Sequence, residues 1–198
     1  MLEELLTRYP ALAACRADIL AAATLLQDTY KNGGKVLACG NGGSCADSEH
    51  IVGELMKGFL LKRPVTDERI PADLQAGLQG SLPAISLPSQ TAVLSAFIND
   101  VDPSMLYAQL VYGYGQPGDL LIGLSTSGNS DNVVKAARVA QAIGVKTLAL
   151  TGERESKLSA LCDVTVRVPE TETFKVQELH LPVYHYLCSE CEKEIFGK

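Results

Sequence analysis

Two polar side chains stand four residues apart in the stretch that follows a glycine-rich turn. His50 and Glu54 share one face if the chain is helical there, because residues four apart on an α-helix lie one above the other. This segment therefore offers an imidazole together with a carboxylate, two groups that can take part in proton transfer.

A glycine-rich turn precedes the pair. The apolar run 36–39 leads into Gly40-Asn41-Gly42-Gly43-Ser44, which predicts a strand, a tight turn and the start of a helix. The N–H groups at a helix N-terminus suit a phosphate or another anion. The spacing is neither G-x-G-x-x-G nor G-x-x-x-x-G-K-[ST], so it does not indicate a dinucleotide or Walker site. The alternative is a plain tight turn without a ligand.

A second polar turn lies at 125–130. It brings Gly128 and four hydroxyl groups to a strand-to-helix junction, those of Ser125, Thr126, Ser127 and Ser130. A single serine would suffice as a helix N-cap. Four hydroxyls exceed that need and favour phosphate binding without a lysine.

The overall charge and composition limit the classes of protein to which this chain can belong. The net charge of −6 gives no basic surface for nucleic acid, and no apolar stretch is long enough to span a membrane. The N-terminus has no secretory pattern, and the six cysteines are scattered, so we expect free thiols in a reducing cytoplasm. Cys188 and Cys191 form a C-x-x-C pair. Without a second such pair, two small apolar residues on a helical face are favoured over a redox or metal site.

The elements that must position these residues alternate along the chain. Apolar runs predict strands at 35–39, 83–87, 120–124, 145–150 and 164–168, and helical patterns occupy 44–59, 90–98, 103–113, 131–143 and 174–195. This order predicts an α/β fold, a three-layer sandwich with a central parallel sheet flanked by helices. Both polar turns follow strands, at the sheet edge where ligands collect.

Two further regions complete a predicted single domain of 1–198. Residues 1–32 read as two helices, or one kinked at Pro10, for packing or oligomerisation. Residues 62–82 form a polar inserted loop with one turn of helix at 73–76. A loop of this length suggests a lid, an interface or a disordered segment.

Together with Asn99-Asp100 and the run from Val176 to His180 and His185, these motifs resemble the sugar isomerase (SIS) domain family, and within it the phosphoheptose isomerases. The resemblance covers about residues 30–196. It implies the flavodoxin-like SIS fold and a homotetramer with shared active sites. It also implies conversion of sedoheptulose 7-phosphate to D-glycero-D-manno-heptose 7-phosphate through an enediol, for bacterial surface-glycan heptose, with one Zn²⁺ in each subunit.

The resemblance also implies residue roles. Glu54 and His185 would be the acid–base pair. The metal ligands would be His50, Glu54, Gln177 and His185. The substrate-binding residues would be Asn41, Gly42, Gly43, Ser44, Asn99, Asp100, Ser125, Thr126, Ser127, Ser130 and Gln177. His180 is expected to be structural or to support the site.

Helix arithmetic adds one expectation about assembly. Gln177 and His185 are eight residues apart, which is about 12 Å along a helix and roughly 80° around it. A metal–ligand bond is only about 2 Å long. We therefore expect either Gln177 or His185 to enter the site from a partner subunit.

Two alternatives stay open. The inserted loop at 62–82 and Phe174, shortly before Gln177, depart from the family pattern and leave the sugar open, so another sugar phosphate is one alternative. The other is a non-catalytic SIS protein, of the replication-initiator-binding or phosphosugar-sensing kind. The pairs His50/Glu54 and Gln177/His185 argue against it.

Overall fold

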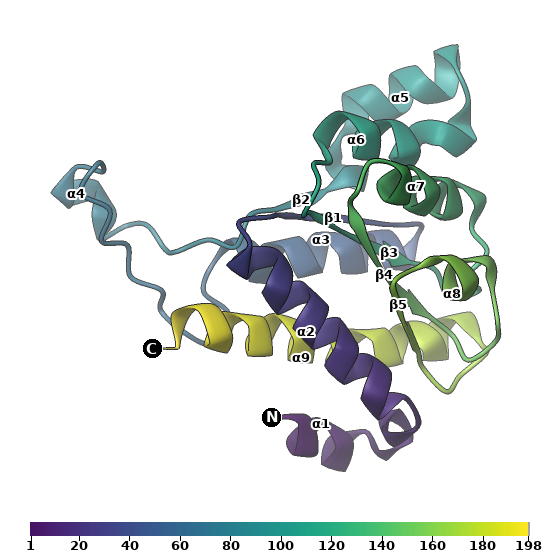
Figure 1. The fold of residues 1–198 in the computed structure, drawn as a ribbon, viewed down its shortest axis with the longest axis horizontal. Coiled ribbons are helices and arrows are strands. Elements are labelled where there is room, and N and C mark those ends of the chain that lie inside the picture. Colours follow the sequence, from purple (N-terminus) through teal and green to yellow (C-terminus); the bar gives the residue numbers. More distant parts are fainter. Residues whose placement is uncertain (198) are drawn as a thin grey trace.

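The computed structural model describes residues 1–197, and its centre is one five-stranded sheet (Figure 1). The strand order is β2-β1-β3-β4-β5, and every neighbouring pair is parallel. This is the flavodoxin-like order, so the predicted α/β sandwich is confirmed. The strands are β1 (Val36–Gly40), β2 (Ala84–Ser86), β3 (Leu120–Leu124), β4 (Lys146–Thr151) and β5 (Val164–Arg167).

The central strands are apolar along their whole length because both faces of the sheet are covered. β1 and β3 are buried at every position. Side chains alternate between two cores, so that Val36 and Ala38 lie in one while Leu37 and Cys39 lie in the other. The strands can therefore hold the loops at their ends rigidly.

Helices cover each core. The first core lies under α1 (Leu2–Arg8), η1 (Pro10–Cys15), α2 (Arg16–Lys31), α3 (Gly43–Met56) and α9 (Thr173–Phe196). The second lies under η2 (Leu87–Ser89), α5 (Thr91–Asp100), η3 (Pro103–Met105), α6 (Leu106–Tyr114), α7 (Asp131–Ala142) and α8 (Lys157–Leu161). α3 and α9 pack against each other on the first face.

Three details differ from the sequence expectation. Pro10 opens a 3₁₀ segment that separates α1 from α2, so the two-helix alternative is right. The short helix α8 was not predicted; a capping box between Ser156 and Ser159 starts it. Pro182 lies inside α9, which nevertheless continues to Phe196.

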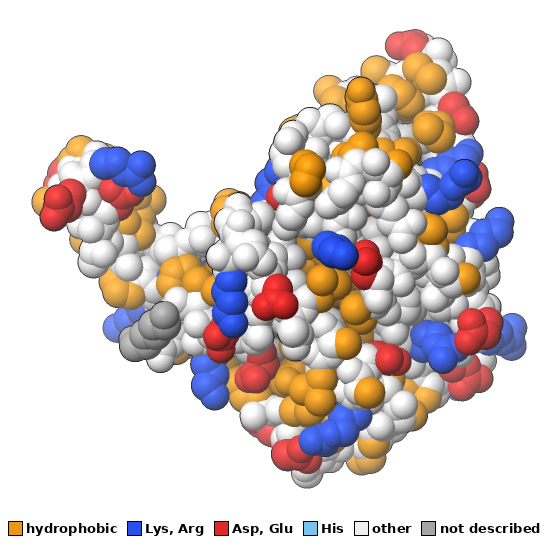
Figure 2. All heavy atoms as spheres, viewed as in Figure 1, with side chains coloured by type: hydrophobic (Ala, Val, Ile, Leu, Met, Phe, Trp, Pro, Cys, Tyr) orange, Lys and Arg blue, Asp and Glu red, His pale blue; other side chains and the backbone are white. Residues whose placement is uncertain are grey.

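Residues 62–82 form an arm that projects from the body of the molecule (Figures 1 and 2). A single antiparallel bridge joins Pro64 to Gln79, and the short helix α4 (Ala72–Gln75) lies near its tip, where one helical turn was predicted. Leu74 and Leu78 are about half exposed on it. Within this chain the arm stands away from the body, which does not fit the lid alternative.

Candidate functional site

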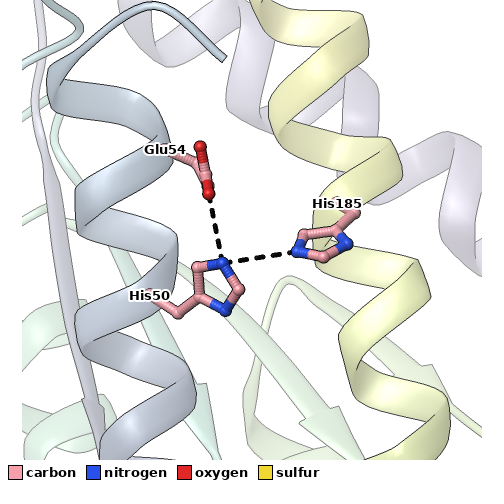
Figure 3. A group of neighbouring side chains, drawn as sticks. All are labelled: His50, Glu54 and His185. Atoms are coloured by element: carbon pink, nitrogen blue, oxygen red, sulfur yellow. Dashed lines mark hydrogen bonds and ion pairs between the residues drawn. The ribbon is translucent and has the colours of Figure 1, made fainter. Parts of the chain in front are cut away.

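Three of the predicted residues converge between α3 and α9 (Figure 3). His50 Nε2 lies 3.1 Å from Glu54 Oε1 and 3.5 Å from His185 Nε2. One ligand atom from each side chain lies within 4.8 Å of the other two. We call His50, Glu54 and His185 the trio. Two nitrogens and a carboxylate oxygen at this spacing can share a proton or a metal ion.

The two helices that carry the trio run in the same direction. Their contacts pair Gly43 with Gln177 near their N-termini and His50 with His185 further along. His50 and Glu54 are one turn apart on α3, so both face α9. The trio therefore needs only one chain. Of the two alternatives for a shared site, the structure does not require His185 to come from a partner subunit.

Gln177 lies nearer the N-terminal ends of the same two helices. Its amide packs on Gly43, where an added Cβ would lie 2.7 Å from Gln177 Nε2. Gly43 precedes His50 by seven residues, which is roughly 10 Å along α3. The structure thus places Gln177 beside the glycine turn and does not bring it to the trio of its own chain. A ligand role for the partner's Gln177 stays a prediction.

Two residues that sequence reasoning missed lie behind His50. Tyr184 is buried, and its hydroxyl lies 3.0 Å from His50 Nδ1 and 3.1 Å from Asp47 Oδ1. Asp47 precedes His50 by three residues on α3, a helical spacing that could have indicated a shared face. Nothing in the sequence marks Tyr184, which stands next to His185 on α9.

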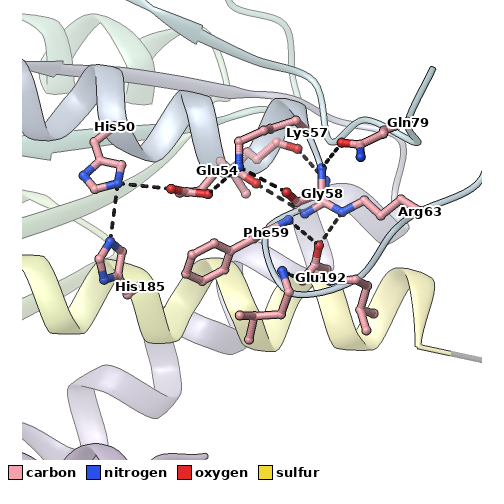
Figure 4. A network of polar contacts seen from close by, with 12 residues as sticks. His50, Glu54, Lys57, Gly58, Phe59, Arg63, Gln79, His185 and Glu192 are labelled. Atoms are coloured by element: carbon pink, nitrogen blue, oxygen red, sulfur yellow. Dashed lines mark hydrogen bonds and ion pairs between the residues drawn. The ribbon is translucent and has the colours of Figure 1, made fainter. Parts of the chain in front are cut away.

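The surroundings of the trio adjust its charge. Partial burial, and then the neighbouring His50, lower the pKa of His185, so its imidazole stays neutral to a lower pH than usual. Lys57 Nζ approaches Glu54 Oε2 at 3.2 Å (Figure 4). Glu54 is thus held between an ammonium group and an imidazole. A neutral imidazole beside a held carboxylate suits proton transfer.

The glycine turn after β1 has the conformation that its residues predict. Gly42 has φ 58°, which favours glycine, and Gly43 has no room for a Cβ because of Gln177. Ser44 is buried in the first turn of α3. Asn41 exchanges two amide hydrogen bonds of 2.9 Å with Asn132 at the start of α7. The loops after β1 and β3 are therefore joined side by side.

The hydroxyl-rich turn after β3 is the second half of this edge. Ser125 Oγ and Ser130 Oγ lie 2.9 Å apart, and Gly128 has φ 65°. Ser130 occupies the N-cap position of α7, yet its side chain makes no capping hydrogen bond. Ser127 Oγ accepts from Asn129 N–H at 3.2 Å. This turn therefore has more hydroxyl groups than a helix N-cap requires. It lies where the strand order reverses, between β1 and β3, which is where ligands bind in such sheets.

Comparison with known proteins matches this arrangement to a family. The family model described as "SIS domain" matches residues 8–152. The phosphoheptose isomerase of Akkermansia muciniphila is 38% identical over 189 residues, which cover 96% of this chain and 92% of the relative. That of Rhodospirillum rubrum is 40% identical over 177 residues, covering 89% and 86%. The chain belongs to the SIS domain family.

Solved structures of SIS-family members agree. The phosphoheptose isomerase of Neisseria gonorrhoeae has a TM-score of 0.79 at 31% identity, covering 96% of this chain and 94% of that one. That of Francisella tularensis has a TM-score of 0.80 at 30% identity, covering 94% and 91%. The family model ends before α9, so it includes His50, Glu54 and both loops but not His185. The relatives matched over most of their length extend the similarity to α9.

Asn99 and Asp100, which the SIS resemblance implicates in substrate binding, are not brought to the trio. They end α5, and Asn99 Nδ2 donates to Asp100 Oδ1 at 2.7 Å. α5 packs over the second core, whereas the trio lies on the side of the first. Their role in this SIS protein stays a prediction.

The other singled-out residues are structural. His180 is fully buried; its Nε2 lies 3.3 Å from the Thr151 carbonyl, and burial lowers its pKa to about 4. Cys188 and Cys191 are buried free thiols, and burial raises the pKa of Cys191 to about 12, so the apolar interpretation is confirmed. Among residues 1–197, no helix has the length and apolarity of a membrane span.

Proposed function

We propose that the protein is a cytoplasmic phosphoheptose isomerase that converts sedoheptulose 7-phosphate to D-glycero-D-manno-heptose 7-phosphate for surface-glycan heptose. The observation that carries this proposal is the trio on α3 and α9 together with the joined loops after β1 and β3, whose N–H and hydroxyl groups suit an anion. The relatives that match almost the whole chain bear the same name. The arm projects from the body and Phe174 is exposed, so within this chain neither feature separates this sugar from another.

The trio suits the proton transfers of this reaction. Glu54 would take a proton from C1 of the ketose, and the resulting enediol would be reprotonated at C2 to give the aldose. His185, with its lowered pKa, would move the hydroxyl proton between O1 and O2. Glu54 Oε1 and His185 Nε2 both lie beside His50 Nε2, so a substrate carbon and its oxygen can meet both groups.

The trio also fits a zinc ion. Its three atoms bring lone pairs together, and a neutral His50 that keeps its proton on Nδ1 would have no hydrogen between Nε2 and Glu54 Oε1. Two imidazoles and a carboxylate form a usual zinc donor set. When bound there, Zn²⁺ would supply Lewis-acid stabilisation of the enediol oxygens. The partner's Gln177 would be the fourth ligand.

The loops after β1 and β3 would hold the two ends of the substrate. Asn41, Gly42, Gly43 and Ser44 would contact the sugar. The phosphate would lie against the hydroxyls of Ser125, Thr126, Ser127 and Ser130 and the first N–H groups of α7.

Phosphate binding can be tested apart from the metal. Because the phosphate site uses hydroxyl and backbone N–H groups, we expect calorimetry to give the same phosphate affinity with and without EDTA. Loss of phosphate binding on chelation would contradict the assignment of 125–130.

A tetramer with shared sites would explain the exposed apolar surface of α5. Although α5 is largely apolar, none of its residues is buried, and Val93, Ile98 and the following Val101 are exposed apolar side chains. Burial against another subunit would remove this apolar surface from water. It would also bring Asn99 and Asp100 towards a neighbouring site.

Subunit exchange tests the shared site with a built-in control. Glu54→Gln chains mixed with Gln177→Ala chains should regain activity, because a hybrid can complete one site. Glu54→Gln mixed with His185→Ala should not, since both residues belong to one chain's trio. Recovery in the second mixture, or none in the first despite exchange seen by native mass spectrometry, would contradict the arrangement.

The activity itself is tested by proton NMR in heavy water. Sedoheptulose 7-phosphate should be consumed with formation of the aldose, and deuterium should appear at C2 when the transferred proton exchanges with solvent. No turnover of this substrate, with turnover of another sugar phosphate, would favour the alternative isomerase. No turnover of any would favour a phosphosugar-binding protein.

A further inference from the structure

A buried polar chain leads away from the trio on the far side of the His50 ring. Nε2 of His50 faces Glu54 and His185, while Nδ1 faces Tyr184 at 3.0 Å. The Tyr184 hydroxyl in turn lies 3.1 Å from Asp47 Oδ1. Tyr184 is 1% exposed, so water does not compete at this end of the ring.

The number of protons limits how these groups can bond. The tyrosine hydroxyl has one hydrogen to donate, and an ionised carboxylate only accepts. If Tyr184 donates to Asp47, its oxygen must accept from His50, and the hydrogen of a neutral imidazole then lies on Nδ1. We infer that Asp47 and Tyr184 are positioning residues that keep the proton of His50 on Nδ1 and leave the lone pair of Nε2 pointing into the trio.

The position of Asp47 favours this direction. Its Oδ1 is bonded to Tyr184, while its buried Oδ2 has no hydrogen-bond partner among the described residues. Burial raises the pKa of Asp47, and the Tyr184 hydroxyl and His50 oppose that rise. A tyrosine hydroxyl keeps its hydrogen at neutral pH, so Tyr184 is an O–H donor. A carboxylate that reaches an imidazole through a hydrogen-bonded partner fixes its tautomer and raises the basicity of the other nitrogen.

His180 provides an internal reference with the opposite tautomer. Its Nε2 lies 3.3 Å from a backbone carbonyl of Thr151, which can only accept, so the proton must be on Nε2. Its Nδ1 has no partner in the described structure. The sequence contains three histidines, so two opposite tautomers can be distinguished in one spectrum.

The decisive measurement is nitrogen NMR of the metal-free full chain with ¹⁵N-labelled histidine rings, above the pKa of free imidazole. His50 should show a protonated Nδ1 and an unprotonated Nε2, and His180 the reverse. The spectrum of His185→Gln assigns the third ring by the loss of its signals. A His50 ring protonated on Nε2 would overturn the inference. This readout requires no substrate, so it stands or falls separately from the proposed reaction.

A matched pair of tyrosine variants tests the consequence for the trio. Tyr184→Phe removes the hydroxyl, whereas Tyr186→Phe makes the same change at a buried tyrosine of α9 outside this polar chain. Loss of a partner that orients a metal-binding histidine costs about 10- to 100-fold in metal affinity. We expect that loss of Zn²⁺ affinity, measured by chelator competition, for Tyr184→Phe only.

Asp47→Asn provides a second variant if Tyr184→Phe does not fold by circular dichroism. It keeps the shape of the side chain but removes its charge, so Zn²⁺ affinity should fall in the same direction. Wild-type Zn²⁺ affinity in the folded Tyr184→Phe or Asp47→Asn protein would overturn the positioning role.

Discussion

Two polar clusters lie between the same pair of helices and differ in how their hydrogen bonds are satisfied. One is the trio. The other is the buried ion pair of Arg63 and Glu192 at the base of the arm (Figure 4). Arg63 is 2% exposed and Glu192 is 1% exposed, whereas the side chain of His50 is 42% exposed.

The ion pair is saturated with partners. Glu192 accepts from Arg63 Nε at 2.7 Å and from the backbone N–H groups of residues 59, 60 and 61 at 2.7–3.1 Å. Arg63 also donates to the carbonyls of Leu55 and Glu54, and its guanidinium lies 4.9 Å from the Phe196 ring centroid. Such a cluster can fix the position of a segment, but its hydrogen-bond donors and acceptors are already occupied and are not available to a substrate.

The trio is less saturated. Glu54 contacts His50 and Lys57, but the His50 side chain is exposed and the nitrogens of His50 and His185 are a long 3.5 Å apart. The comparison shows that the number of buried charges does not identify an active site. In the proposed function the less saturated cluster is the reactive one, and the saturated cluster fixes the geometry around it.

The largest expected effect comes from breaking the ion pair. Arg63→Met leaves Glu192 buried without its counterion, and we expect a loss of about 3–5 kcal/mol in the free energy of unfolding. Urea titration measures it. Arg167→Met is the control, because its pair with Glu155 is exposed and should be worth no more than about 1 kcal/mol. Equal losses in the two variants would refute the distinction.

The next largest effect is a loss of turnover that leaves the stability of the fold unchanged. Glu54→Gln keeps the shape of the side chain but removes the base, so kcat should fall by about a hundredfold or more while the melting temperature stays nearly constant. Glu49→Gln on the same helix, where the carboxylate bonds to Ser89, is the control. Turnover at the wild-type rate in Glu54→Gln would remove this residue from the mechanism.

A smaller effect should appear with pH. Burial pushes the pKa of Glu192 up, but the N–H groups of Leu60 and Phe59 together with Arg63 outweigh it, and the pKa in the folded protein is lowered. The stabilisation is then fully present above the unfolded value of about 4.3 and is lost as the pH falls through the lower folded value. Wild-type stability should therefore fall below that pH more steeply than that of Glu192→Gln. Parallel acid titrations would show that Glu192 does not contribute.

The smallest effect is expected at the tip of the arm. Leu74→Ser and Leu78→Ser change exposed side chains, so each should alter the stability of the chain by no more than about 0.5 kcal/mol. Thermal unfolding at two protein concentrations measures it. A larger loss that depends on concentration would mean that these leucines are covered by another subunit.

Sequence patterns predicted the parts of this molecule that depend on local periodicity. The apolar runs predicted β1 and β3 because both faces of these strands are buried. The glycines predicted the two polar turns because each turn contains a residue with positive φ. His50 and Glu54 were placed on one face by helical spacing alone. Their meeting with His185 depends on how α3 packs on α9, which periodicity does not specify.

The features that the sequence analysis missed depend on tertiary packing. Tyr184 stands beside His185 yet points behind His50, because adjacent residues on a helix face different directions. The burial of Arg63 depends on Glu192, which is 129 positions away. The continuation of α9 through Pro182 reflects packing around the helix, which overrides local preference.

The separation of α3 and α9 along the chain also bears on how quickly a newly folding molecule becomes active. His50 and His185 are 135 positions apart, and every strand pairing between them is parallel and non-local. Contacts of this kind form slowly, since long loops must close first. Turnover during refolding would then report the docking of α9 on α3, and it should lag behind the recovery of helical circular dichroism.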